Sequence, residues 1–413
     1  MAMREQDPSF RNRILGAAIL FALVIVYTWG IFTVFTSQDK GGNDFLSRYM
    51  DWRALVLEGR NPYSDQVAEE IQVILMGRQA TLPGDDQAGL IYPWYAVLVQ
   101  LPFIFFPWPW ARAMYMVFCQ VCIVIGLGLT AHMLKWKLSP AAFALTSVWA
   151  ILFYPEARGI ILGQIVITEY LFGVLTVWLM HVRRDGWAGV CLVLATVKPT
   201  PVFLFVPFIL LYALTRRRWR VIGASGVTLA ALILVGFIIL PTWLSDWLRQ
   251  IARYPEYTVG QSPMWLLTNQ ATRLGDVWTW LLSAVCVGWM LWAWIVALRD
   301  REGAAFHWAM GVTFVVSDLI VYRSATTNYI FLLFPIYLIF AALAHAWPRA
   351  GVWLIVALQG IGLVGLWWLF VATVQGTQEQ PIMFVPQVAV VGLALLLGQR
   401  WLIEHNRQAG VTL

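Results

Sequence analysis

Charged residues are scarce in this sequence. Only 12% of its 413 residues are Asp, Glu, Lys or Arg, whereas soluble domains usually carry about 25%. No polar stretch is long enough to form a separate aqueous domain, and 60% of the residues are hydrophobic. These proportions exclude an ordinary soluble enzyme and predict an all-α, multi-spanning membrane protein that forms a single transmembrane domain over residues 1–413.

Several chemical signatures are also missing. The four cysteines all lie inside apolar segments and form no disulfide framework for an exported domain. The sequence contains no GxxxxGK[ST] loop, no HExxH and no glycine-rich dinucleotide fingerprint, and its five histidines lack metal-ligand spacing. We therefore expect no cofactor, although the adjacent Asp85 and Asp86 leave a divalent metal open. An enzyme of this kind would take an activated substrate from the lipid phase.

The apolar segments predict about 12 membrane crossings, with both termini on one side. The first segment is too long for a signal-peptide core, so we expect an uncleaved spanning helix. Residues 91–106 either dip into the membrane and return, or cross it while a different short segment does not. The predicted segments are 14–35, 111–134, 140–154, 159–180, 187–197, 200–214, 221–241, 277–298, 304–321, 328–346, 351–374 and 383–403.

The distribution of basic residues orients these segments. The loops predicted on the side of the termini hold most of the 28 Lys and Arg residues but few of the 22 acidic ones. Because cytoplasmic loops carry the excess of basic residues, both termini are predicted to be cytoplasmic. The pI near 9.2 then reflects orientation and not nucleic-acid binding.

Two longer polar loops fall on the outer side, over residues 37–90 and 242–276. In the first, Phe45, Tyr49, Trp52 and Val56 share one face, which predicts a short interfacial helix over 45–58. Ser47, Arg48, Asp51 and Glu58 fall largely on other faces. Gly59 and Pro62 end this helix. In the second loop, Trp243, Trp247 and Ile251 recur every four residues, as in a helix lying on the membrane.

Asp44 lies at the start of the first of these helices. A carboxylate there can cap free backbone amides. It can also act as a general base at the membrane boundary, taking a proton from a hydroxyl nucleophile. The two roles are compatible.

Lys198 is the second candidate. A helix that rises from Asp185 would place Lys198 about 20 Å above the cytoplasmic turn, deep in the apolar layer. Pro199 and Pro201 break the helix there, so the chain forms an intramembrane hairpin. An intramembrane cation indicates an anion site, although a lysine that snorkels to the surface is the alternative.

Two further clusters contain polar residues. In residues 154–170, Glu156 and Arg158 lie at an outer turn, and Gln164 and Glu169 lie farther in. The second cluster, in residues 317–329, lies at another outer helix end. Gln164 can hydrogen-bond a substrate or a neighbouring helix. Arg323 is a phosphate candidate, because guanidinium binds phosphate through paired donors, but it can equally neutralise Asp318. Asn328 and Tyr329 follow shortly after Arg323.

The order of these motifs resembles glycosyltransferase family 87. The chain has an Asp after the first helix, then "EGRNPY", "YPWYAVLVQLPF", "GQ" within a helix, "KPTP" and the basic "RRRWR". The resemblance covers about residues 14 to 220. Members of this family are multi-spanning enzymes of the glycosyltransferase C superfamily. They use polyprenyl-phosphate mannose as donor and include phosphatidylinositol-mannoside mannosyltransferases.

The resemblance implies a glycosyltransferase C-like fold and a role for each motif. Asp44 would deprotonate the acceptor hydroxyl, which attacks the anomeric carbon in one inverting displacement. Lys198 and Arg323 would bind the departing phosphate, and the polyprenyl tail would lie near residues 187–214. The remaining candidates for substrate contacts are Asn61, Tyr63, Tyr92, Gln164, Asn328 and Tyr329.

The sequence therefore predicts a membrane glycosyltransferase that moves a sugar, mannose by the family pattern, from a polyprenyl phosphate to a glycolipid or glycan acceptor. The expected location is a bacterial plasma membrane, with the active site on the outer face. A transporter or lipid flippase is the alternative, since it too has intramembrane charges and broken helices. Transporters commonly contain an internal repeat, however, and this sequence has no second copy of its motifs. A membrane assembly scaffold would leave Lys198 unexplained.

Overall fold

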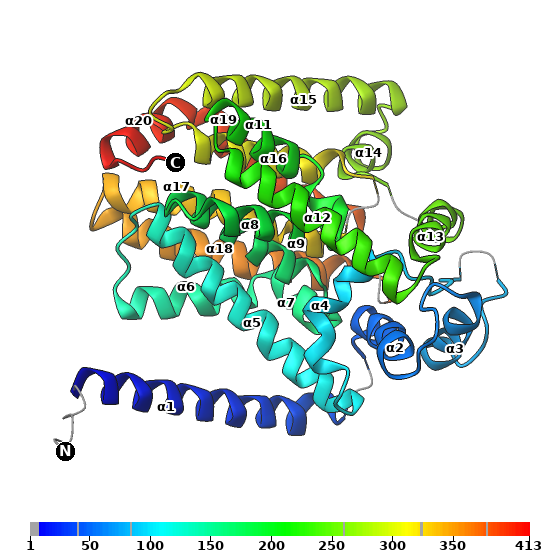
Figure 1. Ribbon diagram of the computed structural model, residues 1–413. Helices are drawn as coiled ribbons and strands as arrows, with labels where there is room; N and C mark the ends of the chain where they lie inside the picture. Colours follow the sequence, from blue (N-terminus) through cyan, green and yellow to red (C-terminus); the bar gives the residue numbers. More distant parts are fainter. Residues whose placement is uncertain (1–7, 39–40, 83–84, 259–260, 323–324, 377–378) are drawn as a thin grey trace, which may run out of the picture.

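The computed structural model describes residues 8–38, 41–82, 85–258, 261–322, 325–376 and 379–413. The described part of the chain is helical, without a β-strand. Its long helices run side by side in one bundle (Figure 1). By length and composition, 6 of these helices could cross a membrane, or up to 8 if each of two bent pairs counts as one span. This agrees with a multi-pass membrane protein.

The longest helices form the frame of the bundle. They are α1 (Pro8–Ile31, continued by the π-helical η1, Phe32–Thr36), α5 (Trp108–Met133), α12 (Trp219–Ile239), α15 (Asp276–Arg299), α17 (Leu333–Ala346, preceded by η5, Thr326–Leu332) and α18 (Ala350–Thr373).

These helices divide into a centre and a periphery. In the apolar stretches of α5 and of η5–α17, 61% and 67% of the residues are buried. The corresponding share is only 6% in α1 and α12, and 17% in α15 and α18. In water such exposed apolar faces would be strongly unfavourable. Their exposure is therefore the pattern expected of helices that face lipid. Figure 1 shows α1 and α15 along opposite sides of the bundle.

Shorter and broken helices fill the bundle. They are α6 (Pro140–Leu152), α7 (Tyr154–Leu162), α8 (Val166–His181), α9 (Asp185–Leu194), α10 (Pro199–Val202), α11 (Phe205–Thr215), α16 (Phe306–Ile320), α19 (Pro386–Leu397) and α20 (Gln399–Ala409).

Two predicted segments are broken where continuous helices were expected, and those predictions were wrong. Segment 159–180 is interrupted after Leu162, because Gly163 adopts φ +71° and ends α7. Segment 383–403 bends by 69° between α19 and α20, at Gly398. The break predicted at Lys198 is confirmed, and it separates α9 from α10.

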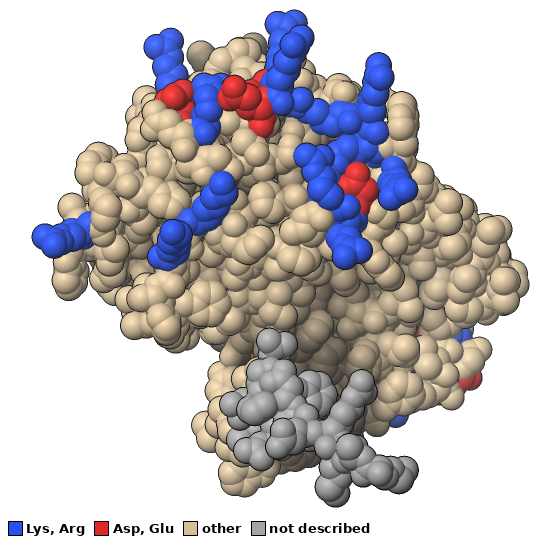
Figure 2. Space-filling model, turned by 60° about the vertical axis from the view of Figure 1, so that its left-hand side comes forward, with Lys and Arg blue, Asp and Glu red and all other residues tan. Residues whose placement is uncertain are grey.

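The basic loops meet at one end of the bundle. The Lys135 ammonium donates to the Ala409 carbonyl at 3.0 Å, and Arg218 forms an ion pair with Asp185 at 2.7 Å. Figure 2 shows Lys and Arg side chains gathered over this end, with few acidic ones among them. The loops predicted to share one side therefore do lie together, as the positive-inside rule requires.

The opposite end carries the remaining helical elements. They are α2 (Asn43–Leu57), α3 (Asp65–Met76), η2 (Trp94–Ala96), α4 (Val97–Gln100), η3 (Leu101–Phe103), α13 (Trp243–Tyr257), α14 (Pro263–Trp265), η4 (Leu266–Ala271) and η6 (Pro381–Phe384). Residues 94–103 form a short, irregular helical segment. Ten residues rise about 15 Å as a helix, half of an apolar core of about 30 Å. Of the two alternatives left open by the sequence, this length favours the one in which residues 91–106 dip and return.

The helix predicted over 45–58 is confirmed as α2, but its surroundings differ from the expectation. Its apolar face packs against protein: Phe45 and Trp52 are fully buried, and the Phe45 ring stacks on Tyr115 of α5 with centroids 4.2 Å apart. Two residues assigned to its other faces, Arg48 and Asp51, are also buried. The helix was expected to lie on the membrane, yet it is built into the protein.

Candidate active site

Four chain breaks or helix starts meet at the end of the bundle opposite the basic loops. They are the start of α2, the α7–α8 break, the α9–α10 break and η5. In that order, they carry the predicted residues Asp44, Gln164, Lys198 and Asn328. Hydrogen bonds connect these four side chains in series. We call them, with the charged residues that surround them, the Asp44 cluster.

A tight backbone turn positions Asp44. Gly42 occupies the N-cap position with φ +82°, and a Cβ there would lie 2.7 Å from Nε of Arg112. Only glycine satisfies both the left-handed backbone and the close contact. Because Gly42 is the N-cap, Asp44 lies in the first turn, where the helix dipole favours its negative charge. Its Oδ2 accepts a hydrogen bond from Nε2 of Gln164 at 2.6 Å.

Gln164 lies in the break after α7, and the geometry of Gly163 holds it there. A Cβ on Gly163 would lie 2.4 Å from Cβ of Phe45, so this break can approach α2 only with glycine at that position. The Gln164 amide donates to Asp44 through Nε2 and accepts from Nζ of Lys198, at 3.4 Å, through Oε1. A carboxylate needs a donor and an ammonium needs an acceptor, so both contacts select this amide orientation.

Lys198 is the last residue before α10. Its Nζ donates to Oδ1 of Asn328 at 2.8 Å. Glu169 of α8 is fully buried and interacts electrostatically with Lys198, although no described residue donates a hydrogen bond to either of its carboxylate oxygens. A cation held by two neutral amides and one nearby carboxylate retains donor capacity for an anionic ligand.

Arg48 adds a second cation beside Asp44. Its guanidinium donates to the Gly163 carbonyl at 2.6 Å and to the Tyr92 hydroxyl at 3.3 Å. Tyr92 interacts electrostatically with Asp44, so this ring also borders the carboxylate. Burial raises the pKa of Tyr92, and Arg48 opposes the shift. The phenol is therefore neutral at physiological pH.

Arg158 of α7 is a third cation, and Asp44 lies close enough to interact with it electrostatically. Glu379, in the segment between α18 and η6, forms an ion pair with Arg158 and accepts hydrogen bonds from Tyr154, at 2.6 Å, and from Thr326. The Glu379 carboxylate thus joins α7 to η5, which carries Asn328. It anchors Arg158 at the edge of the cluster.

Three other predicted residues lie outside the hydrogen-bonded chain. Asn61 donates to Asp246 of α13 at 2.8 Å and so ties the two outer loops together. Tyr63 is buried and donates to the Tyr92 carbonyl at 2.9 Å, behind the cluster. Tyr329 donates to the carbonyl of Phe384 at 2.9 Å. Arg323 lies outside the described residues.

Sequence reasoning did not identify Arg48, Glu169 or Glu379 as site residues, and it left Arg158 at an outer turn without a role. Glu169 and Arg158 lie within the stretch that contains Gln164, so charged residues inside an apolar segment were the available signal. Glu379 is an acidic residue in a polar loop, and nothing in its sequence surroundings marks it as a site residue. Its contact with Arg158 joins positions far apart in the sequence.

In this cluster the carboxylate of Asp44 is bordered by the cations Lys198, Arg48 and Arg158, while Glu169 lies near Lys198 and Glu379 pairs with Arg158. Such a set can accept a proton at the carboxylate while the cations stabilise an anionic leaving group. Among the described residues, no group of three or more His, Cys, Asp or Glu side chains is close enough to hold a metal ion. Asp85 binds Arg78 at 2.7 Å, and Asp86 accepts from the Ala88 amide.

Comparison with known proteins identifies a family. The model of glycosyltransferase family 87 matches residues 90–320, which is more than half of the chain and includes Tyr92, Gln164 and Lys198. No curated protein and no solved structure matches the chain.

Proposed function

The chain belongs to glycosyltransferase family 87, and on that premise we propose that this membrane glycosyltransferase moves mannose from a polyprenyl-phosphate donor to an acceptor hydroxyl. The observation that carries the proposal is the contact of the Asp44 carboxylate with Gln164, beside three cations. Asp44 is the general base. Lys198, Arg48 and Arg158 bind the donor phosphate, and Arg323 remains a proposed fourth partner.

The proposed reaction is a single displacement. Asp44 takes the proton of the acceptor hydroxyl, and that oxygen forms a bond to the anomeric carbon. The bond from the anomeric carbon to the phosphate oxygen breaks, and the polyprenyl phosphate leaves as an anion, so no strong general acid is needed. The cations stabilise its growing charge. One displacement inverts the anomeric configuration.

Tyr92, Gln164 and Asn328 would contact the sugar or the phosphate from this cluster. Asn61, Tyr63 and Tyr329 were predicted to contact substrate as well. Their hydrogen bonds to protein groups support a role in holding the outer loops and η6 around the site.

An apolar groove of about 800 Å³ between α1 and α5 supports a lipid-borne donor. Phe103 and Phe106 line it, and the Phe103 ring packs edge-on against Phe45, the residue after Asp44. We propose that the polyprenyl tail lies in this groove and not along residues 187–214, because Phe103 in the groove lining contacts Phe45, the neighbour of Asp44.

The proposed membrane arrangement keeps the 12 predicted segments and places both termini in the cytoplasm of a bacterial cell. In it, α9 and α10–α11 form one intramembrane hairpin, since α9 has ten residues and rises only about 15 Å. The hairpin enters and leaves on the same side, so both ends of the chain stay together. The cluster around Asp44 then faces the outer side, in a glycosyltransferase C-like arrangement.

A donor comparison tests this function. Purified protein in detergent is given radiolabelled mannose as polyprenyl-phosphate mannose or as GDP-mannose, with a membrane glycolipid extract as acceptor. We expect transfer from the lipid-linked donor alone. Transfer from the nucleotide sugar alone would contradict the proposal, and movement of intact lipid across vesicles without transfer would favour a flippase.

The charge reversal Lys198→Glu tests the proposed phosphate contact. A carboxylate would repel the phosphate, and loss of a buried charge contact costs about 2–5 kcal/mol. We therefore expect the affinity for polyprenyl phosphate to fall by at least about 30-fold. Lys135→Glu is the matched control, because Lys135 lies at the opposite end and contacts the Ala409 carbonyl. Equal affinity in the two variants would remove Lys198 from the site.

A further inference from the structure

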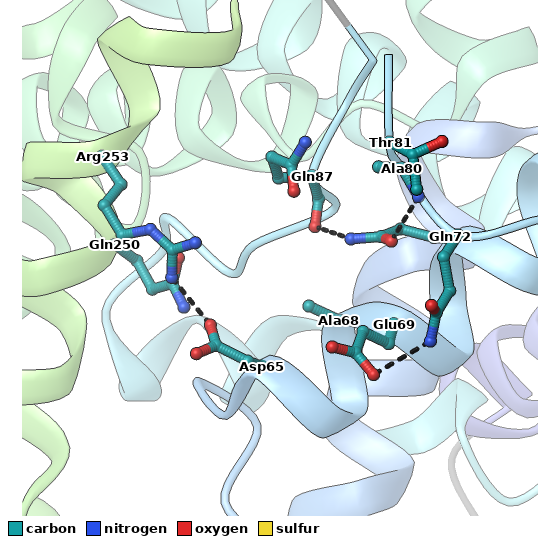
Figure 3. A pocket seen from close by; sticks show the side chains of 10 residues that line it. Asp65, Ala68, Glu69, Gln72, Ala80, Thr81, Gln87, Gln250 and Arg253 are labelled. Atoms are coloured by element: carbon teal, nitrogen blue, oxygen red, sulfur yellow. Dashed lines mark hydrogen bonds and ion pairs between the residues drawn. The ribbon is translucent and has the colours of Figure 1, made fainter. Parts of the chain in front are cut away.

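A polar pocket of about 220 Å³ lies between the two outer loops, away from the Asp44 cluster. Figure 3 shows its lining side chains converging from α3, from the loop positions 79–81 and 87, and from α13. Asp65 and Glu69 come from α3, whereas Gln250 and Arg253 come from α13. Pockets for drug-sized ligands measure about 300–1,000 Å³. This one is smaller, so it fits a single sugar residue or a polar group of that size.

The walls of the pocket are fixed by internal contacts (Figure 3). Gln72 donates through Nε2 to the Gln87 carbonyl at 2.9 Å and accepts the Ala80 amide through Oε1 at 2.8 Å, which holds the loop against α3. Arg253 forms an ion pair with Asp65 at 2.7 Å, which joins α13 to α3. A ligand therefore meets a preformed site and does not have to order these segments.

The lining chemistry favours neutral hydroxyl groups. Two carboxylates outweigh the single guanidinium, so the pocket repels phosphate and other anions. Each carboxylate offers about four acceptor positions, and the contacts of Asp65 with Arg253 and of Glu69 with Gln79 use only part of them. Sugar hydroxyls donate to carboxylates and can both donate to and accept from amides. These groups match a carbohydrate better than a lipid phosphate.

Contacts link the pocket to the candidate active site. The Gln250 amide donates to the Tyr63 carbonyl at 2.8 Å, and the Tyr63 hydroxyl donates to the Tyr92 carbonyl at 2.9 Å. Tyr92 in turn receives a hydrogen bond from Arg48, beside Asp44. A series of contacts through Tyr63 and Tyr92 therefore connects the pocket with the candidate active site.

We propose that this pocket binds one sugar residue of the acceptor, remote from the hydroxyl that is elongated. The inference rests on the proposed function and deepens it: the acceptor is a glycan of several residues, and its sugar chain is recognised on the outer loops. The donor phosphate binds elsewhere, at the cluster of cations.

Binding of a neutral oligosaccharide tests the inference without requiring turnover. Saturation-transfer NMR on the purified full chain measures the affinity for mannotetraose in the wild type, Glu69→Ala and Thr81→Trp. Glu69→Ala removes an acceptor from the pocket, and Thr81→Trp fills it from an exposed loop position. Because hydrogen bonds to charged groups contribute about 1.5–3 kcal/mol, we expect each variant to weaken binding by about tenfold or more.

Glu70→Ala is the matched control. It removes the same charge from the next position of α3, but Glu70 pairs with Arg60 at 2.9 Å outside the pocket, so its affinity should equal that of the wild type. Equal affinity in all four proteins, or no binding by the wild type, would overturn the inference. Either result would leave transfer from the polyprenyl-phosphate donor intact. If the wild type bound mannotetraose but did not transfer mannose from the polyprenyl-phosphate donor, the proposed function would be refuted and the inferred sugar site would stand.

Discussion

The side-chain amide of Gln164 bridges two charged residues, Asp44 and Lys198. Its two polar atoms contact Asp44 and Lys198 on opposite sides, so the carboxylate and the ammonium are held near each other without a direct ion pair. A direct pair would occupy both groups. The interposed amide leaves Asp44 able to accept a proton and Lys198 able to contact an anion, and this separation is what the proposed reaction needs.

Asp51 is expected to make the stability of the folded protein depend on pH. Burial in α2 raises its pKa well above 3.8, and Arg48 opposes the shift. The folded state then holds the proton more tightly than the unfolded state. Stability is greatest below about pH 4 and falls as the pH rises toward the raised pKa. We expect the melting temperature of the detergent-purified protein to decrease from pH 5 to pH 8.

The variant Asp51→Asn should flatten this decrease, because an amide does not titrate. Glu58→Gln changes an exposed carboxylate at the end of the same helix and should keep the wild-type slope. The explanation fails if Asp51→Asn and the wild type show parallel melting curves across the whole range.

At the scale of helices, the break between α7 and α8 positions the site. Gly163 combines φ +71° with a Cβ position 2.4 Å from Phe45. Gly163→Ala should therefore cost about 1–3 kcal/mol of backbone strain, with a similar cost for the clash. We expect a lower melting temperature and slower transfer, since Gln164 moves with the break. Both are measured on purified protein.

Gly226→Ala is the control for this change, because a Cβ there meets nothing within 4 Å and the residue lies inside α12. Its transfer rate should match the wild type. A Gly163→Ala variant with normal stability and normal transfer would show that the break does not position Gln164.

The two kinds of break differ in how far the sequence predicts them. Pro199 and Pro201 follow Lys198 directly, and proline cannot continue a helix, so that break and its lysine were predictable. Gly163 stands alone in an apolar run, where glycine is tolerated within helices. Its left-handed conformation depends on packing against Phe45, which comes from a segment more than a hundred residues earlier. Only the folded chain reveals that contact.

Packing explains the misjudged residues of α2 as well. The periodicity of apolar residues identified the helix correctly, and it assigned Arg48 and Asp51 to its other faces. Both are buried in the folded protein. Arg48 donates to the Gly163 carbonyl and to Tyr92, and Asp51 interacts electrostatically with Arg48. A one-dimensional pattern separates apolar from polar positions, but it does not show which polar positions have partners.

The two ends of the helix bundle differ in charge and in the sites that they carry. The basic loops and the C-terminal helix α20 meet at one end, and the Asp44 cluster and the polar pocket lie at the other (Figures 1 and 2). Charge distribution in the sequence was sufficient to predict this division. The number of crossings was harder to predict, because α8, α9, α11 and α16 are shorter than the roughly 20 residues of a spanning helix.

Cysteine labelling tests the proposed orientation. Gln66→Cys places an exposed thiol on α3, and Arg220→Cys places one at the basic end. A membrane-impermeant maleimide should label Cys at position 66 in intact cells, but position 220 only after permeabilisation. The native cysteines are buried or half-buried in apolar helices, and the unsubstituted protein serves as the background control. The reverse pattern would place the Asp44 cluster in the cytoplasm.

The transfer rate of Asp44→Asn with polyprenyl-phosphate mannose as donor tests directly whether Asp44 is the general base. The amide keeps the size of the side chain but cannot take the acceptor proton, and loss of a general base typically costs about 10²–10⁴-fold in rate. We predict a loss in that range, with the melting temperature and the affinity for polyprenyl phosphate close to wild type. Wild-type transfer by a folded Asp44→Asn protein would show that Asp44 is not the general base.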